Sequence, residues 1–566
     1  MTATDFEELP QIGRLRHCSI TRTPMATSSD FDLLEEHWIP VLDRHGRARQ
    51  ESVRSLFRNA HELSTLAGEL PTQAFAMLRL LLAVLRRSVI DRPGSSAKVW
   101  EGLWSQPFLP TAEIDAYLTT HAARFRLFDQ QAPFFQVADL RAVNGKVSSL
   151  DRMIADVPNG EKYFTTRAGA AVELLEFGEA ARWLVHAHAF DPSGIKTGAV
   201  GDPRVKAGKG YPIGLGWAGN LGGVFLEGAT LRETLLLNLV LRDINAERFA
   251  ADDLPAWERP PGRADVGRAR RPTGPADLCT WQSRRIRLVH NNTHVTGAVL
   301  CNGDPLEPFN QHLLEPMTAW RLSPTQTKKV GHTRHYPLTH NPSKALWRGL
   351  TGLIEQVGVS AGIAERAIAP GLLEWVSHLL EEGVLEPTHQ VRLHAVGMEY
   401  INNQSVVGDI VDDTIGFRAA LLAADPALRY AAIHAAQTAE QAVTALGSLA
   451  GNLAIATGGE AAGHKERAYE RGYFALETPY RRWLADLRPD AGLTACGERW
   501  QRVVDEVITS IGRGLVDSAG EPAWVGREVK GTYIDASLAR IWFHARLRKL
   551  LPAAYIEDNH EKGSAA

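Results

Sequence analysis

Alanine-rich helical periodicity fills the last quarter of the chain and limits what that part can fold into. From about residue 415 onward apolar residues recur at helical spacing, and glycine or polar breaks are few. Asp425 and Pro426 mark a helix start, because proline is favoured in the first turn of a helix. Four amphipathic helices with short connections are typical of an up-down bundle, which we expect over residues 416–566. The predicted helices are 426–456, 464–488, 497–516 and 533–552.

Residues 31–415 lack this uniformity and combine segments of helical and of strand character. The glycine-rich segment 194–228 cannot be regular structure throughout, because glycine is a poor residue in helices and strands. We therefore expect an α+β chain, in which a large mixed α/β N-terminal domain over 31–415 precedes the C-terminal four-helix bundle. The apolar spacing predicts helices at 73–91, 111–125, 230–241 and 347–356, and strands at 38–41 and 285–290.

The first 30 residues and the overall charge exclude several classes of protein. Residues 1–30 form a polar lead that is expected to be disordered, and Met25 within it is an alternative initiation residue. Because the sequence shows no signal peptide and no apolar run of membrane-spanning length, we expect a cytoplasmic protein without a membrane partner. Lys and Arg total 62 and Asp and Glu total 65, for a net charge of −3. This balance excludes nucleic-acid binding through a polybasic tail.

Short motifs that match enzyme patterns lack the context that the chemistry needs. Gly358 to Gly362 match GxSxG around Ser360, but a nucleophile elbow follows a buried strand, whereas 347–356 is predicted to be a helix. His290 and His294 have the spacing of a helical zinc pair, yet the intervening residues lack the glutamate of a zinc peptidase. Four scattered cysteines contain no CxxC pair. We expect no catalytic residue, no metal and no cofactor, and a serine hydrolase using Ser360 remains an alternative.

Five motifs in the same order along the chain resemble the CasA family, the large subunits of the type I-E CRISPR surveillance complex, Cascade. The opening LLEEHWIPV at 33–41 resembles the family's start. Further matches are NLGG followed by a leucine-rich segment at 220–238, PAWERP at 255–260, Trp281-Gln282, and INNQS at 401–405. Each motif alone is weak, but together they span about 31–553.

The resemblance implies a non-catalytic subunit that recognises the short PAM beside a double-stranded DNA target and starts duplex opening. Guide RNA held by the other Cascade subunits then pairs with the exposed strand, a division of labour seen across RNA-guided systems. The resemblance also implies contact with the crRNA 5′ handle and recruitment of the CRISPR helicase-nuclease. A scaffold that binds only protein partners remains another alternative.

The same resemblance implies which residues contact DNA. Gln404 matches the family's wedge glutamine, which enters the base step beside the PAM from the minor groove, and Asn403 and Ser405 match its neighbours. Opening a base step costs a few kcal/mol, which contacts to the opened strands offset. From the residues alone, 402–404 would be a polar turn that caps the following segment.

Two further loops are implied by the resemblance. The segment YFTTRAGA at 163–170 resembles the loop that reaches the crRNA 5′ handle through Phe164, Thr165 and Thr166, and the PAM minor groove through Gly169. Some relatives place a lysine finger after the tryptophan-glutamine strand, but this chain reads HNNTHVT there, without lysine. The alternative donors at this position are His290, Asn291, Asn292 and His294.

Basic segments at 196–209, 259–287 and 328–334 are expected to follow DNA phosphates, which give affinity independent of base sequence. The alternative for each residue is a solvated surface cation. The predicted phosphate contacts are Lys206, Lys209, Arg268, Arg270, Arg271, Lys328 and Lys329.

Overall fold

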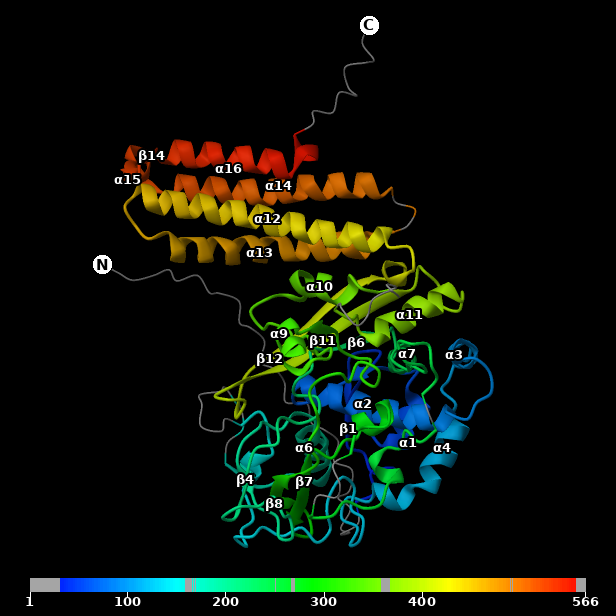
Figure 1. Cartoon of the computed structure of the whole chain (residues 1–566). Helices are drawn as coiled ribbons and strands as arrows, with labels where there is room; N and C mark the ends of the chain where they lie inside the picture. The colour runs from blue at the N-terminus through cyan, green and yellow to red at the C-terminus, as the bar shows by residue number, and fades with distance from the viewer. Residues whose placement is uncertain are drawn as a thin grey trace, which may run out of the picture.

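A computed structural model describes most of the chain between residues 31 and 555. The described ranges are 31–157, 165, 167, 169–249, 251–265, 270–357, 367–488, 490 and 492–555. Figure 1 shows two regions: a body of short helices and small sheets, and a layer of long, nearly parallel helices above it. The mixed helix and strand content with helices at the C-terminal end confirms the predicted α+β class.

All strand pairs in the described residues are antiparallel. One three-stranded sheet has the order β2-β1-β3 and another the order β12-β11-β6, and the remaining strands form two-stranded pairs β4-β5, β7-β8, β9-β10 and β13-β14. The strands are β1 Ile39–Asp43, β2 Ala48–Glu51, β3 Leu63–Leu66, β4 Lys196–Thr197, β5 Lys209–Gly210, β6 Gly223–Glu227, β7 Arg284–His290, β8 Val295–Asn302, β9 Trp320–Leu322, β10 His335–Pro337, β11 Gln390–Ile401, β12 Val406–Arg418, β13 Arg527–Val529 and β14 Thr532–Ile534.

Helix α2, Pro71–Val89, is the central helix of the body and is buried along most of its length. It starts with proline in its first turn and ends with two arginines, as expected for a helix macrodipole. Arg79 is fully buried on α2 and forms two hydrogen bonds with Glu315, at 2.7 and 2.6 Å, which compensate the burial of both charges. The other helices of the body are α1 Val53–Asn59, α3 Ser96–Trp104, α4 Thr111–Thr120, α5 Ala170–Glu173, α6 Phe177–Phe190, α7 Leu231–Leu237, α8 Pro275–Cys279, α9 Pro324–Val330, α10 Leu346–Ile354 and α11 Gly371–Glu381.

Four long helices form the C-terminal layer and agree with the four predicted stretches to within a few residues. They are α12 Ala427–Ala456, α13 Ala461–Asp486, α14 Leu493–Asp517 and α16 Ala536–Leu550, with the short α15 Gly520–Val525 before the last. Alanines and glycines on α12 let its neighbours approach closely: a Cβ on Gly447 would lie 2.0 Å from the Tyr469 ring of α13. The Trp500 indole of α14 donates to the Ala435 carbonyl of α12, at 2.8 Å.

The C-terminal helices pack directly on the body through α10 and β12. Trp347 of α10 is fully buried, and its ring centroid lies 5.1 Å from that of Tyr480 on α13. Arg481 of α13 donates to the Asp413 carboxylate at 2.7 Å and to the Thr414 carbonyl. One continuous cluster of buried apolar side chains extends through both regions. The predicted division after residue 415 falls within β12, which ends at Arg418.

Three sequence predictions were wrong in extent. The helix predicted to reach residue 241 ends at Leu237, where the Asn238 amide pairs with both backbone groups of Leu226. The helix predicted over 111–125 ends at Thr120 and continues as a 3-10 turn. Segment 259–287 was predicted as a surface loop before the strand, but α8 lies within it and Arg284 and Arg285 are buried.

Candidate functional site

The long β11–β12 hairpin ends in an exposed turn formed by residues 402–405. In Figure 1 the hairpin runs from beneath the long helices toward the segment that contains β4. Asn402, Asn403 and Gln404 all have left-handed backbone angles, with φ of 50°, 58° and 66°. Asparagine tolerates this region, whereas for glutamine it costs about 1–2 kcal/mol. The turn therefore holds an exposed glutamine in a strained backbone conformation.

Hydrogen bonds within the turn involve its backbone and Ser405 and leave two amide side chains free. The Ser405 amide donates to the Ile401 carbonyl at 3.1 Å, and its hydroxyl donates to the Asn402 carbonyl at 2.7 Å. Asn403 and Gln404 are exposed, and their side chains form no hydrogen bond with any described residue. Each amide can therefore donate and accept at once toward a partner outside the chain.

A cleft of about 590 Å³ lies beside the turn and joins it to the β4–β5 segment. It is lined by Ser405 and the next two residues of β12, and on the other side by Gly194, Lys196 and Lys209. Gly194 has φ of 149°, and a Cβ there would lie 3.9 Å from the Ser405 Cβ. The structure thus brings two predicted site residues, Ser405 and Lys209, to one cleft.

A buried carboxylate fixes the floor of this cleft. Asp191 pairs with Lys196 at 2.7 Å and with the buried Arg284 of β7. Burial alone would raise the pKa of Asp191, but the charges of Lys196 and Arg284 outweigh burial and hold the pKa below its ordinary value. Burial also lowers the pKa of Lys196. Arg284 further donates to the Asp191 carbonyl at 2.9 Å. Several ion pairs and hydrogen bonds therefore hold this part of the body together.

The loop that was predicted to reach the crRNA handle is described only in part. Phe164 and Thr166 lie outside the described residues. The Thr165 hydroxyl accepts a hydrogen bond from the Arg167 amide at 3.1 Å, and Arg167 pairs with Asp156 and Glu179. Gly169 is exposed with φ of 54°, and a Cβ there would meet nothing within 4 Å.

The segment predicted to replace a lysine finger is the turn between β7 and β8. The Asn291 side-chain oxygen accepts from the backbone amides of Thr293 and His294, at 2.8 and 2.7 Å, and so shapes the turn. The His290 ring packs on Phe128, with centroids 4.0 Å apart. Asn292 is exposed and His294 is half-buried.

The predicted phosphate contacts fall into two groups. Lys206, Lys209, Lys328 and Lys329 are exposed, the last two on α9. Arg270 instead pairs with the buried Asp277 at 2.5 Å and lies 4.0 Å from the centre of the Trp281 ring. Arg271 is also exposed and lies 3.6 Å from Glu307. Arg268 lies outside the described residues.

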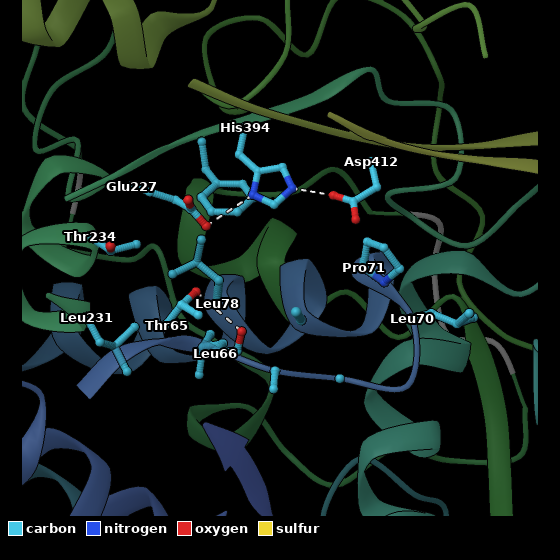
Figure 2. Close-up of a pocket in the computed structure, with 14 residues that line it drawn as sticks. Thr65, Leu66, Leu70, Pro71, Leu78, Glu227, Leu231, Thr234, His394 and Asp412 are labelled. Atoms are coloured by element: carbon cyan, nitrogen blue, oxygen red, sulfur yellow. Dashed lines mark hydrogen bonds and ion pairs between the residues drawn. The ribbon is translucent and has the colours of Figure 1, made fainter. Parts of the chain in front are cut away.

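A smaller pocket of about 210 Å³ lies at the base of the same hairpin (Figure 2). His394 of β11 sits there between two carboxylates, 3.1 Å from Glu227 of β6 and 2.5 Å from Asp412 of β12. Burial alone would lower the pKa of His394, but the hydrogen bonds to Glu227 and Asp412 outweigh it and raise the pKa above its ordinary value. This bridge links all three strands of the sheet that carries the turn.

Among the described residues, no three His, Cys, Asp or Glu side chains are grouped so that they could hold a metal ion. None of the helices in the described ranges has the length and apolar character needed to cross a bilayer. Two histidines that follow the basic segment 328–334 have separate surroundings: His340 pairs with the Gly223 carbonyl at 2.9 Å, whereas His335 belongs to β10. Ser360 lies outside the described residues.

Sequence reasoning missed the two strands that present the turn. Residues 390–401 and 406–418 carry β-branched and apolar residues in partial alternation around a polar NNQS, which is a hairpin signal. The pairing of His394 with Glu227 and Asp412, and of Asp191 with Lys196 and Arg284, had no comparable signal because the partners are not neighbours in sequence.

Comparison with known proteins agrees with this fold. Residues 32–511 match the family model described as CRISPR-associated protein Cse1. The crystal structure of Thermobifida fusca Cse1 is 44% identical, with a TM-score of 0.86 over 93% of this chain and 99% of that chain. CasA/Cse1 of Thermus thermophilus is 28% identical over 494 residues, covering 83% of this chain and 90% of that protein.

A CRISPR RNA-guided surveillance complex contains a chain of the same fold, at 19% identity and a TM-score of 0.62, covering 87% of this chain and 98% of that chain. The family match covers most of the sequence, and the Cse1 structure from Thermobifida fusca superposes on nearly all of it. The chain therefore belongs to the Cse1 family of CRISPR-associated proteins.

Proposed function

We propose that this chain is the non-catalytic large subunit of a type I-E Cascade complex, in which it recognises the PAM in double-stranded DNA and starts duplex opening. Its partners would be the other Cascade subunits, the crRNA 5′ handle and the CRISPR helicase-nuclease, which it helps to recruit. The observation that carries the proposal is the exposed turn 402–405, with left-handed backbone at three consecutive residues and two unpaired amides.

The turn has the chemistry that a minor-groove reader needs. The minor groove offers acceptors on every base pair and one donor on guanine, so its pattern is degenerate. The neutral amides of Asn403 and Gln404 can match both, and they add no charge that would favour the phosphates over the base edges. Projection from a two-stranded stalk lets Gln404 enter a base step while the body stays outside the groove.

Exposed lysines of the β4–β5 segment and of α9 support a phosphate path toward this turn. Lys209 shares the cleft with Ser405, and Lys206 lies in the same β4–β5 turn. Lys328 and Lys329 extend from α9. Such contacts position a duplex without reading its sequence.

The proposal is tested by Gln404→Ala in the assembled complex with guide RNA. Opening of a fully paired target should slow, while a target with a pre-opened bubble beside the PAM should bind and open as with the wild type, because its unstacking cost is already met. The measurement is the fluorescence of 2-aminopurine placed beside the PAM. Gln131→Ala, at an exposed glutamine elsewhere on the body, is the matched control.

A second variant separates the wedge from a purely structural turn. Gln404→Gly removes the amide and also the strain of a left-handed glutamine, so the protein should become more stable by about 1 kcal/mol while paired DNA opens more slowly. If Gln404 only shapes the turn, Gln404→Ala lowers stability and affects paired and bubbled targets alike. If the wild-type complex does not change the gel mobility of a PAM-bearing duplex at low salt, the chain is better explained as a scaffold that binds only proteins.

A further inference from the structure

Tyr400 fastens the hairpin to the body two residues before the turn. Its hydroxyl donates to the carbonyl of Phe190, the last residue of α6, at 2.6 Å. Burial raises the pKa of this phenol well above its ordinary value, so the hydroxyl keeps its proton and remains a donor. A Cβ at Gly219 would lie 2.8 Å from the Tyr400 oxygen, so only glycine leaves room for this contact.

The contact lies at the one irregular position in the β11–β12 ladder. Glu399 faces Asp409 and Tyr400 faces Val407, which leaves Gly408 as an extra residue on β12. A Cβ at Gly408 would lie 2.8 Å from a side-chain carbon of Ile401, so glycine is needed there too. A bulge bends and twists a strand, and the end of the hairpin therefore changes direction at Tyr400.

The residue that receives the bond belongs to a rigid part of the body. Asp191 follows Phe190 directly, and its carboxylate is held by Lys196 and Arg284. The Asp191 backbone carbonyl also accepts hydrogen bonds from Arg284 and from the Gly216 amide, both at 2.9 Å. A bond from the hairpin to the Phe190 carbonyl therefore fixes the hairpin relative to β4, β7 and the cleft.

We propose that Tyr400 is a positioning residue that sets the direction in which Gln404 projects, so that the Gln404 amide is preorganised for DNA binding in the free protein. Without the hydrogen bond from Tyr400 to Phe190, the turn can pivot about the bulge. The turn would then have to become ordered while Gln404 enters the base step, which slows opening of the duplex. This inference rests on the proposed function, because it assigns Tyr400 a role in opening through Gln404.

The test removes one oxygen atom at each of two tyrosines. Tyr400→Phe should slow opening of a paired target in the assembled complex by a factor of about 2 to 10, the range expected for removal of one hydrogen bond. Tyr480→Phe is the matched control, because the Tyr480 hydroxyl also donates to a backbone carbonyl, that of Ala432 at 3.0 Å, within the C-terminal helices. It should lower thermal stability as Tyr400→Phe does, yet leave opening unchanged.

Combining the variants separates positioning from general stability. If Tyr400 acts through Gln404, Tyr400→Phe adds no further delay to Gln404→Ala, and a bubbled target restores the wild-type rate to either variant. Independent, additive delays, or equal loss on paired and bubbled targets, would overturn the inference. A delay with Gln404→Ala and none with Tyr400→Phe would overturn it while leaving the proposed function intact. No delay with Gln404→Ala would overturn both.

Discussion

At the scale of single residues, two side chains of the β11–β12 hairpin are held in uncommon states. Gln404 has a left-handed backbone, which bulky residues rarely adopt. His394 is held by two carboxylates inside a mostly apolar pocket. The β11–β12 ladder and its neighbours hold both side chains in place, and backbone strain like that of Gln404 is found most often at functional sites.

His394 gives the sheet a pH-dependent stability. Arg392 also faces this bridge and pairs with Glu227 at 3.0 Å. Because the folded-state pKa of His394 lies above the ordinary value of 6.5, its contribution is fully present below that pH and is lost as the pH rises through the folded pKa. The free energy of unfolding should therefore fall with pH, above about pH 6, more steeply in the wild type than in His394→Gln.

Denaturant unfolding at several pH values measures this difference. Asp412→Asn serves as the control, because it keeps a hydrogen-bonding group but removes one negative charge. It should therefore reduce the dependence of the free energy of unfolding on pH without abolishing it. Parallel curves for the wild type and His394→Gln would contradict the prediction.

At the scale of elements, the exposed lysines of α9 differ from Arg270, whose guanidinium is held in an ion pair with a buried carboxylate. Lys328 and Lys329 project from α9, whereas Arg270 is occupied by Asp277 and Trp281. Replacing Lys328 and Lys329 with alanine should reduce the slope of log affinity against log salt by about one unit for each phosphate that the protein no longer neutralises.

The matched variant for this experiment is Arg270→Ala. It leaves Asp277 with one partner fewer and should lower stability while the salt slope stays unchanged. The DNA affinity of the assembled complex is measured over a series of salt concentrations. An unchanged slope without Lys328 and Lys329 would remove α9 from the DNA path.

At the scale of the whole molecule, the C-terminal helices and the body share one apolar core. Trp347 is fully buried where α10 meets α13. Trp347→Ala should lower the free energy of unfolding by about 3–5 kcal/mol, the usual cost of a large buried cavity. It should also separate the unfolding of the two regions, since the indole that packs α10 against Tyr480 is removed.

Calorimetry tests this coupling. We expect one transition in the wild type and two in Trp347→Ala, and Trp542→Ala, at a partly exposed tryptophan of α16, should retain one. Two transitions in the wild type would show that the shared core does not couple the two regions.

Local patterns in the sequence determined the class of fold, the four long C-terminal helices and the family motifs. Helical periodicity and capping act over a few residues, so 426–456 could be predicted within one residue of α12. The INNQS motif also marked residues 402–405, which form the exposed turn of the hairpin.

Only the tertiary structure decided how that turn is presented. The hydrogen bond from Tyr400 to Phe190 joins residues 210 positions apart, and the bridge from His394 to Glu227 joins residues 167 positions apart. The same holds for the arginines: Arg284 and Arg270 look like surface cations in sequence, yet each pairs with a buried aspartate. Charge and hydrogen-bond partners in a folded chain are set by proximity in space, which local periodicity does not encode.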